Sequence, residues 1–206
     1  MNVKRTTVKH LTLKILVLGD SSVGKTSLIN QFVNNNFTIK YKATVGVDLS
    51  TKIIAMNNSI VQLQIWDPSG SERFRSVNES FFRGTDGFIM ACSLTSLESF
   101  VNMEYWMKDI EEVLGTTVPF IPVANKCDVD EVDWAFSKTK FDNWCSQKGV
   151  PGFYVSAKDK TNVENAFTLL CENIVNNLKD YRSDEFKESS PKIDLGEKIN
   201  KKSSCC

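Results

Sequence analysis

One eight-residue stretch constrains the fold of this 206-residue chain more than any other. Residues 19–26, Gly-Asp-Ser-Ser-Val-Gly-Lys-Thr, match G-x-x-x-x-G-K-[ST], a loop whose backbone N–H groups surround the phosphates of a nucleotide. Gly19 and Gly24 permit a close approach that a Cβ atom would block. Lys25 brings a mobile positive charge to the terminal phosphates, and the Thr26 hydroxyl suits Mg²⁺. The predicted nucleotide contacts of this loop are Ser21, Ser22, Val23, Gly24, Lys25, Thr26 and Ser27.

The sequence on either side of this loop supports the prediction. Residues 11–18 are apolar and rich in branched side chains, as expected of a buried strand. In residues 26–33 the apolar side chains recur on one helical face. A strand, a glycine-containing loop and a helix in this order direct the helix N-terminus at an anion. This context disfavours the alternative of an ordinary strand-to-helix turn, so we predict that the chain binds a nucleotide.

A second segment indicates which base is recognised. Residues 119–124 read as a buried strand, and the polar residues Asn125, Lys126 and Asp128 follow at its carboxyl end, where α/β sheets bind ligands. A carboxylate at Asp128 can accept from both N1–H and the 2-amino group of guanine, whereas adenine would leave it unpaired. The next predicted strand, residues 152–155, ends in Ser156, Ala157 and Lys158, whose backbone can meet the guanine O6. The pattern therefore predicts guanine recognition.

From about residue 11 to residue 178 the chain resembles a Rab small GTPase of the Ras superfamily. The segments that carry the resemblance are residues 41–48, 65–67, 72–74, 81–84 and the terminal pair Cys205 and Cys206. Within the Rabs it is most similar to the late-endosomal and lysosomal subgroup, through residues 41–44, 64–66, 162–167 and the tail around residues 185–186.

The resemblance implies further site residues. Thr44 is the threonine whose hydroxyl binds Mg²⁺ and whose N–H meets the γ-phosphate, and Asp67 holds the metal through water, so the metal set is Thr26, Thr44 and Asp67. Gly70 contacts the γ-phosphate, and the implied catalytic set is Lys25, Thr44, Gly70 and Ser71. Phe37 fits the aromatic that packs on the purine, with a plain core phenylalanine as the alternative. Thr38 and Tyr41 complete the implied contacts to GTP or GDP.

In the family, effector proteins bind an apolar surface while the γ-phosphate orders the two switch loops, which correspond here to the segments around Thr44 and Gly70. By resemblance this surface comprises Leu49, Trp66 and Phe81. Leu49 replaces the usual phenylalanine, which changes the shape of the patch. The alternative for Trp66 is a purely structural core position.

One departure from the family pattern concerns hydrolysis. The family has Asp-Thr-Ala-Gly-Gln-Glu where residues 67–72 of this chain read Asp-Pro-Ser-Gly-Ser-Glu. Ser71 is too short to position the attacking water as the family glutamine does, and Pro68 stiffens the hinge of the second switch. Three hypotheses follow: a regulated switch with slow unaided hydrolysis, a GTP-bound membrane recruiter with negligible turnover, and a metabolic P-loop kinase or ATPase.

Composition is consistent with one core-forming domain. Hydrophobic residues make up 41% of the chain, and Lys+Arg and Asp+Glu both total 25, which argues against nucleic acid as a partner. The sequence has no 18-residue apolar run and no signal-peptide core. Four cysteines lack metal-ligand spacing and are interpreted as reduced small hydrophobic residues: Cys92, Cys127, Cys145 and Cys171.

The order of predicted elements gives the fold class. Strands alternate with helices, and the one clear hairpin lies at residues 56–59. We expect an α/β fold with a doubly wound, mainly parallel six-stranded sheet, one antiparallel edge and helices on both faces. The expected strands are 11–19, 46–55, 60–66, 87–93, 119–124 and 152–156, the expected helices 25–34, 98–114, 134–148 and 162–179, and a mobile segment spans 67–82.

We divide the chain into an N-terminal extension (1–10), a GTP-binding domain (11–180) and a flexible tail (181–206). Cys205 and Cys206 match the Rab double-geranylgeranyl signal. Residues 183–206 carry five basic and five acidic residues, so the tail is not a second, polybasic membrane signal. The resemblance implies a monomer on the cytoplasmic face of late endosomes, lysosomes or phagosomes, with a cytosolic pool. Its implied partners are effectors, an exchange factor, an activating protein, the prenylation escort protein and the GDP-dissociation inhibitor.

Overall fold

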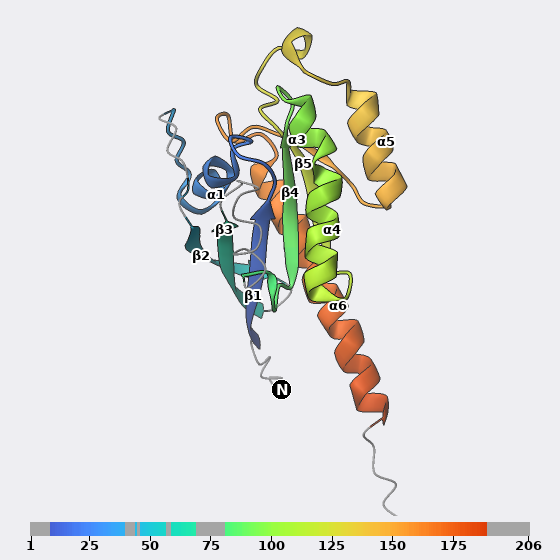
Figure 1. The fold of residues 1–206 in the computed structure, drawn as a ribbon. Helices are drawn as coiled ribbons and strands as arrows, with labels where there is room; N and C mark the ends of the chain where they lie inside the picture. The colour runs from blue at the N-terminus through green and yellow to red at the C-terminus, as the bar shows by residue number, and fades with distance from the viewer. Residues whose placement is uncertain (1–8, 40–43, 45, 57–58, 69–80, 189–206) are drawn as a thin grey trace, which may run out of the picture.

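The computed structural model describes residues 9–39, 44, 46–56, 59–68 and 81–188. Its elements alternate between strand and helix along most of the chain (Figure 1). In order they are β1 (Lys9–Leu18), α1 (Lys25–Asn34), β2 (Val47–Met56), β3 (Ser59–Pro68), β4 (Gly87–Ser93), α3 (Leu97–Val101), α4 (Met103–Leu114), β5 (Phe120–Asn125), a 3₁₀ helix (Glu131–Asp133), α5 (Lys138–Lys148), β6 (Phe153–Val155) and α6 (Val163–Glu188).

The strands form one six-stranded sheet in the order β2-β3-β1-β4-β5-β6. Every neighbouring pair is parallel except β2 and β3, whose register runs from Val47 opposite Pro68 to Met56 opposite Ser59. The antiparallel pair is the predicted hairpin, because only two residues separate Met56 from Ser59. The predicted fold class is confirmed. The carboxyl ends of β1, β4, β5 and β6 therefore meet at one edge, which is where this topology places ligands.

Two hydrophobic clusters fill the two faces of the sheet. Along β1, Leu13, Ile15 and Val17 belong to one cluster, and the alternating residues Leu16 and Leu18 belong to the other. The first cluster packs α1 and α6 against the sheet, and the second packs α3, α4 and α5. Central parallel strands are buried on both faces in this way, which explains their almost continuous apolar sequences.

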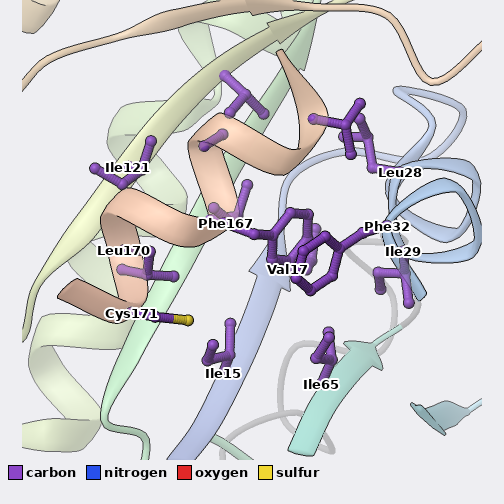
Figure 2. Close-up of a cluster of buried hydrophobic side chains, with 14 of the residues drawn as sticks. Ile15, Val17, Leu28, Ile29, Phe32, Ile65, Ile121, Phe167, Leu170 and Cys171 are labelled. Carbon is purple, nitrogen blue, oxygen red and sulfur yellow. The ribbon is translucent and has the colours of Figure 1, made fainter. Parts of the chain in front are cut away.

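The contact between α1 and α6 is built on two stacked rings. Phe32 of α1 and Phe167 of α6 lie with ring centroids 4.1 Å apart and an interplanar angle of 6°. Figure 2 shows this pair above Ile15 and Val17 of β1, with Leu170 and Cys171 on the neighbouring turn of α6. Helix α1 starts directly after the phosphate loop, so this stack fixes the position of the helix whose first residues are Lys25 and Thr26.

The helix boundaries differ from the sequence prediction in three places. The expected helix 98–114 is divided at Asn102, whose side chain turns to Asp20 instead of solvent. The expected helix 134–148 begins only at Lys138, because Ser137 caps it by accepting from the Lys140 N–H. The last helix continues to Glu188, so part of the expected flexible tail is helical, and in Figure 1 its C-terminal half projects beyond the sheet.

That extension of α6 has a reason in the sequence. The prediction ended the helix where the apolar periodicity stops, but residues 180–188 include neither glycine nor proline, and the next proline is Pro191. At the other end of the chain, β1 begins at Lys9, inside the expected N-terminal extension. Asp67 and Pro68, expected in the mobile segment, are the last residues of β3.

Three of the four central cysteines are buried, as interpreted from the sequence, and Cys127 is half-buried. Burial raises the pKa of the Cys145 and Cys171 thiols to about 12, and it also raises the pKa of Cys92 and Cys127. These thiols are therefore poor nucleophiles near neutral pH. Among the described helices, none combines the length and apolar character that crossing a membrane requires.

Candidate nucleotide-binding site

The glycines of the phosphate loop occupy positions that exclude a side chain. Gly19 has φ +136°, and a Cβ atom there would lie 2.0 Å from the Ala91 carbonyl oxygen of β4. Gly24 has φ +99°, and its Cβ would lie 2.4 Å from Nδ2 of Asn125. Ser22 also has a positive φ, 64°, although it carries a side chain. The loop is thus packed tightly against β4 and β5, and glycine is required at both positions.

Lys25 is buried at the start of α1. Its Nζ donates to the carbonyl oxygens of Gly19 and Asp20, both at 2.9 Å. Burial lowers the pKa of this ammonium group to about 8, against the opposing effect of the Asp67 and Asp20 carboxylates. A buried cation whose partners in the described part of the chain are two carbonyl oxygens is a strong potential partner for phosphate oxygens.

Three predicted metal ligands converge from different parts of the sequence. The Thr26 hydroxyl donates to Asp67 Oδ2, and the Thr44 hydroxyl lies 3.0 Å from Thr26 Oγ1 and 3.4 Å from the same carboxylate oxygen. Asp67 Oδ1 is buried and has no hydrogen-bond partner among the described residues. Burial raises the pKa of Asp67, opposed by the Thr26 hydrogen bond and the Lys25 charge. Two hydroxyls and a carboxylate with an unpaired oxygen fit a hard cation such as Mg²⁺.

The residues predicted for base recognition are also brought together. Asp128 Oδ1 accepts from the Ser156 hydroxyl at 2.7 Å, and its Oδ2 lies 3.5 Å from Lys158 Nζ. The Ser156 hydroxyl accepts in turn from the Asp159 N–H at 2.9 Å. Lys126 has φ +69°, and burial lowers its pKa against the opposing effect of Asp128. The two loops that follow β5 and β6 therefore form one hydrogen-bonded unit around Asp128.

Asn125 connects the base loops to the phosphate loop, a role that the sequence did not reveal. Its Nδ2 donates to the Val23 carbonyl at 2.8 Å, and its Oδ1 accepts from the Ala157 N–H at 3.2 Å. Gln31 of α1 adds a second link by donating to the Ala157 carbonyl at 2.8 Å. Both side chains are buried. A buried amide after a strand was the only sequence signal for these links.

The remaining predicted contacts are only partly described. Phe37 is half-buried and packs against the cluster shared by α1 and α6, and Thr38 is exposed. Tyr41, Gly70 and Ser71 lie outside the described residues, as do Cys205 and Cys206.

The three predicted effector-surface residues lie side by side. Leu49 of β2 is directly opposite Trp66 of β3, and the Phe81 ring lies 6.0 Å from the Trp66 ring. Leu49 is 49% exposed, and Trp66 and Phe81 are half-buried. Lys14 of β1 places its ammonium group 4.8 Å from the Trp66 ring centroid. Trp66 is therefore not a fully buried core residue, the alternative considered from the sequence.

The sheet order and the loops at its carboxyl edge define a P-loop GTPase of the Ras-like α/β type. The Ras family profile matches residues 14–176. The chain is 37% identical to the GTP-binding protein yptV5 of Volvox carteri, over 97% of this chain and 99% of that protein. It is 42% identical to the Ras-related protein Rab7A of Mesembryanthemum crystallinum over 80% of this chain and 83% of that protein, and 38% identical to the Ras-related protein Rab-7a of Dictyostelium discoideum over 82% and 85%.

The chain belongs to the Ras family and, within it, to the Rab small GTPases of the Rab7 type. It is accordingly a GTPase and a GTP/GDP switch of endolysosomal trafficking.

Proposed function

We propose that this Rab7-type protein is a lipid-anchored switch that binds Mg²⁺ with GTP or GDP and hydrolyses GTP slowly unless an activating protein assists. The observation that carries the proposal is the convergence of Thr26, Thr44 and Asp67 within hydrogen-bond distance of one another, next to the buried Lys25. Thr26 lies at the start of α1, Thr44 precedes β2 and Asp67 lies at the end of β3, so a nucleotide with its metal would tie all three together.

Each residue has a defined task in this proposal. Lys25 exchanges its carbonyl partners for phosphate oxygens, and Thr26, Thr44 and Asp67 hold Mg²⁺. The metal, when bound, neutralises charge on the β- and γ-phosphates. Asp128 accepts from the guanine ring, and Phe37 packs on its edge. Loss of the γ-phosphate removes a partner of Thr44 and Gly70, so both switch loops can relax.

Slow unaided hydrolysis is proposed because Ser71 stands where the family has glutamine. A serine side chain is shorter than a glutamine side chain by two bonds, too short to position the attacking water directly as the family glutamine does. Rab-type activating proteins commonly supply both an arginine and a glutamine, so stimulated turnover does not require Ser71.

A second candidate function shares the same binding site. The replacements Pro68, Ser69 and Ser71 together alter the start of the second switch. If an activating protein cannot correct that segment, the chain remains GTP-bound and serves only to recruit effectors to a membrane.

Single-turnover GTP hydrolysis, with and without a Rab-type activating protein, separates the two candidates. We expect a slow unaided rate and strong stimulation; no stimulation would select the recruiter. Ser71→Gln is expected to raise the unaided rate by about tenfold or more, since a side chain that holds the attacking water in line with the γ-phosphate accelerates the reaction by positioning it. Ser71→Ala is the matched control, because a lower rate there would show that the hydroxyl already works through a bridging water.

Effector binding is proposed at the patch of Leu49, Trp66 and Phe81. Leu49 and Trp66 form a cross-strand pair beside the residues that sense the γ-phosphate, and the patch presents apolar surface around Leu49. We propose that the protein acts as a monomer, with an exchange factor and the GDP-dissociation inhibitor as its further partners.

Membrane attachment is proposed through two prenyl groups on Cys205 and Cys206, added with the help of the prenylation escort protein. One lipid chain binds only reversibly, and the tail has no excess of basic residues to assist it. In cell fractionation, Cys205→Ser or Cys206→Ser alone should leave a weakly attached protein, and the double substitution a cytosolic one. A double variant that still sediments with late endosomes would contradict this anchor.

A further inference from the structure

The carboxylate of Asp20, in the phosphate loop, is held by the helices on the opposite face of the sheet from α1. Its Oδ2 accepts from Asn102 Nδ2 at 2.7 Å, and its Oδ1 accepts from the Trp106 indole N–H at 2.9 Å. Both donors are more than 80 residues away in the sequence. Each carboxylate oxygen thus has its own donor, and charge-assisted bonds of this kind are stronger than neutral ones.

The junction of α3 and α4 is arranged to make this contact. Asn102 ends α3 and precedes α4 with helical backbone angles, φ −70° and ψ −11°, and its side chain caps neither helix. Asparagine in such a position commonly bonds to nearby backbone groups. Here its amide is directed at Asp20 instead, and Trp106, one turn further, is buried in the second cluster with its N–H aimed at the same carboxylate.

The contact bears directly on the phosphate-binding part of the loop. The carbonyl of Asp20 accepts from Lys25 Nζ, so the residue held by α4 is also a partner of the phosphate-binding lysine. On its other side, Gly19 is packed against the Ala91 carbonyl of β4. The segment 19–20 is therefore fixed from both sides, and the orientation of the next loop N–H groups depends on it.

We propose that Asn102 and Trp106 are positioning residues that act through Asp20 to set how firmly the phosphate loop holds a nucleotide. They touch no nucleotide themselves. Loosening them lets the loop N–H groups turn from the phosphates, which speeds nucleotide release and leaves guanine recognition at Asp128 unchanged. The inference rests on the proposed nucleotide site.

A charge-repulsion and rescue pair tests this proposal. Asn102→Asp places a second carboxylate against Asp20, and we expect GDP release to become about tenfold faster, the effect of losing one charge-assisted hydrogen bond. Asp20→Asn alone removes the charge from both hydrogen bonds but keeps an acceptor for Trp106, and the Asn102 amide can turn to offer its oxygen, so we expect a smaller increase in release than for Asn102→Asp. The double variant Asp20→Asn/Asn102→Asp restores a donor–acceptor pair and should return the release rate to the wild-type value.

The indole donor has a matched control in α5. Trp106→Phe removes the indole N–H that donates to Asp20. Trp144→Phe removes an equivalent N–H that donates to Glu104 at 2.6 Å and not to the phosphate loop. Both tryptophans are buried in the same cluster, so both variants lose similar packing. Only Trp106→Phe should speed GDP release, by about tenfold.

The measurement is the release of a fluorescent GDP analogue from the full chain with Mg²⁺ present, with xanthosine diphosphate competition as the base-recognition readout. Rescue by the double variant, with unchanged preference for guanine, supports the proposal. Equal effects of Trp106→Phe and Trp144→Phe, or no rescue, would overturn it and assign the contact to general stability. Failure of the wild-type chain to bind GDP at all would refute the proposed function instead, so the two failures are distinguishable.

Discussion

The two halves of the candidate site are built in different ways. On the base side, Asp128 is hydrogen-bonded to Ser156, and Asn125 and Gln31 tie the adjoining loop to the rest of the sheet. On the phosphate side, Lys25 binds two backbone carbonyls, and Asp67 keeps one buried oxygen without a partner among the described residues. On the base side, the polar side chains are hydrogen-bonded within the protein. On the phosphate side, a buried ammonium group and an unpaired carboxylate oxygen remain that suit an anion and a metal.

This difference has a functional meaning. Groups that are already positioned by hydrogen bonds lose little entropy when a ligand arrives, and they reject ligands that leave them unpaired. A buried cation and a half-paired carboxylate are costly on their own, so the phosphate side is stabilised by whatever completes it. In our proposal, selection of the base is therefore assigned to the hydrogen-bonded half of the site, and sensing of the phosphate to the half that the protein leaves incomplete.

The largest expected effect is on the base side, at Asp128. Asp128→Asn should weaken GTP by about 10⁴-fold, because a site built to pair hydrogen-bond donors rejects a mismatch by factors of this size. The amide places a donor where xanthine has a carbonyl, so XTP should bind better than GTP. Competition between the two nucleotides measures the change; retention of tight GTP binding would show that Asp128 does not read the base.

The connection between the two halves can be broken at Asn125. Asn125→Ala leaves the Val23 carbonyl and the Ala157 N–H without their partner, which should cost about 3 kcal/mol of unfolding free energy. Both base and phosphate binding should weaken in the same variant. Urea unfolding followed by fluorescence measures the loss.

The control for that variant is an exposed asparagine. Asn165 is exposed, and among the described residues it donates to Asn162, so Asn165→Ala should change the unfolding free energy by less than about 0.5 kcal/mol. A similar loss in both variants would mean that Asn125 is not a special link between the two halves.

On the phosphate side, a change in a proposed metal ligand should alter the affinity for GTP more than the affinity for GDP. Thr26→Asn disturbs the group formed with Thr44 and Asp67, and we expect GTP to be weakened about 100-fold more than GDP, since Mg²⁺ held by these residues would neutralise charge on the γ-phosphate, which GDP lacks. Nucleotide dissociation rates measure this difference. Chelation of Mg²⁺ by EDTA should bring wild type and variant close together; a difference that persists in EDTA would argue against a metal role for Thr26.

In both halves, the sequence predicted local features of the site better than contacts between distant elements. Local signatures, such as Gly24 and Lys25 or Asp128 after a strand, predicted which residues meet, because parallel strands deliver their carboxyl ends to one edge. The links between distant elements were not predicted. Asn102 and Trp106 read as ordinary helical residues, and only the packing of α4 beside the loop gives them Asp20 as a partner.

The sequence prediction of where helices begin and end was wrong in places for a related reason. The pattern of apolar residues predicted the middle of each helix, but Ser137 as a cap and Asn102 as a junction act through single hydrogen bonds that leave the pattern unchanged. The residues after position 180 were interpreted as a flexible tail because the apolar periodicity stops there, although their backbone propensity permits the helix that continues to Glu188.

The smallest expected effect concerns strain in the phosphate loop at Ser22. Its φ of +64° lies in the left-handed region, which costs a residue with a side chain about 1–2 kcal/mol relative to glycine. Glycine in turn loses more freedom on folding, so Ser22→Gly should raise the unfolding free energy by only about 0.5 kcal/mol. Ser21→Gly is the matched control: Ser21 is not among the residues with positive φ, so this change should lower stability by a similar amount. Thermal unfolding of the GDP-bound forms, run side by side, measures both. Opposite signs in the two variants would confirm that the loop holds Ser22 in a strained conformation; a loss of stability in both would show that the loop relaxes around it.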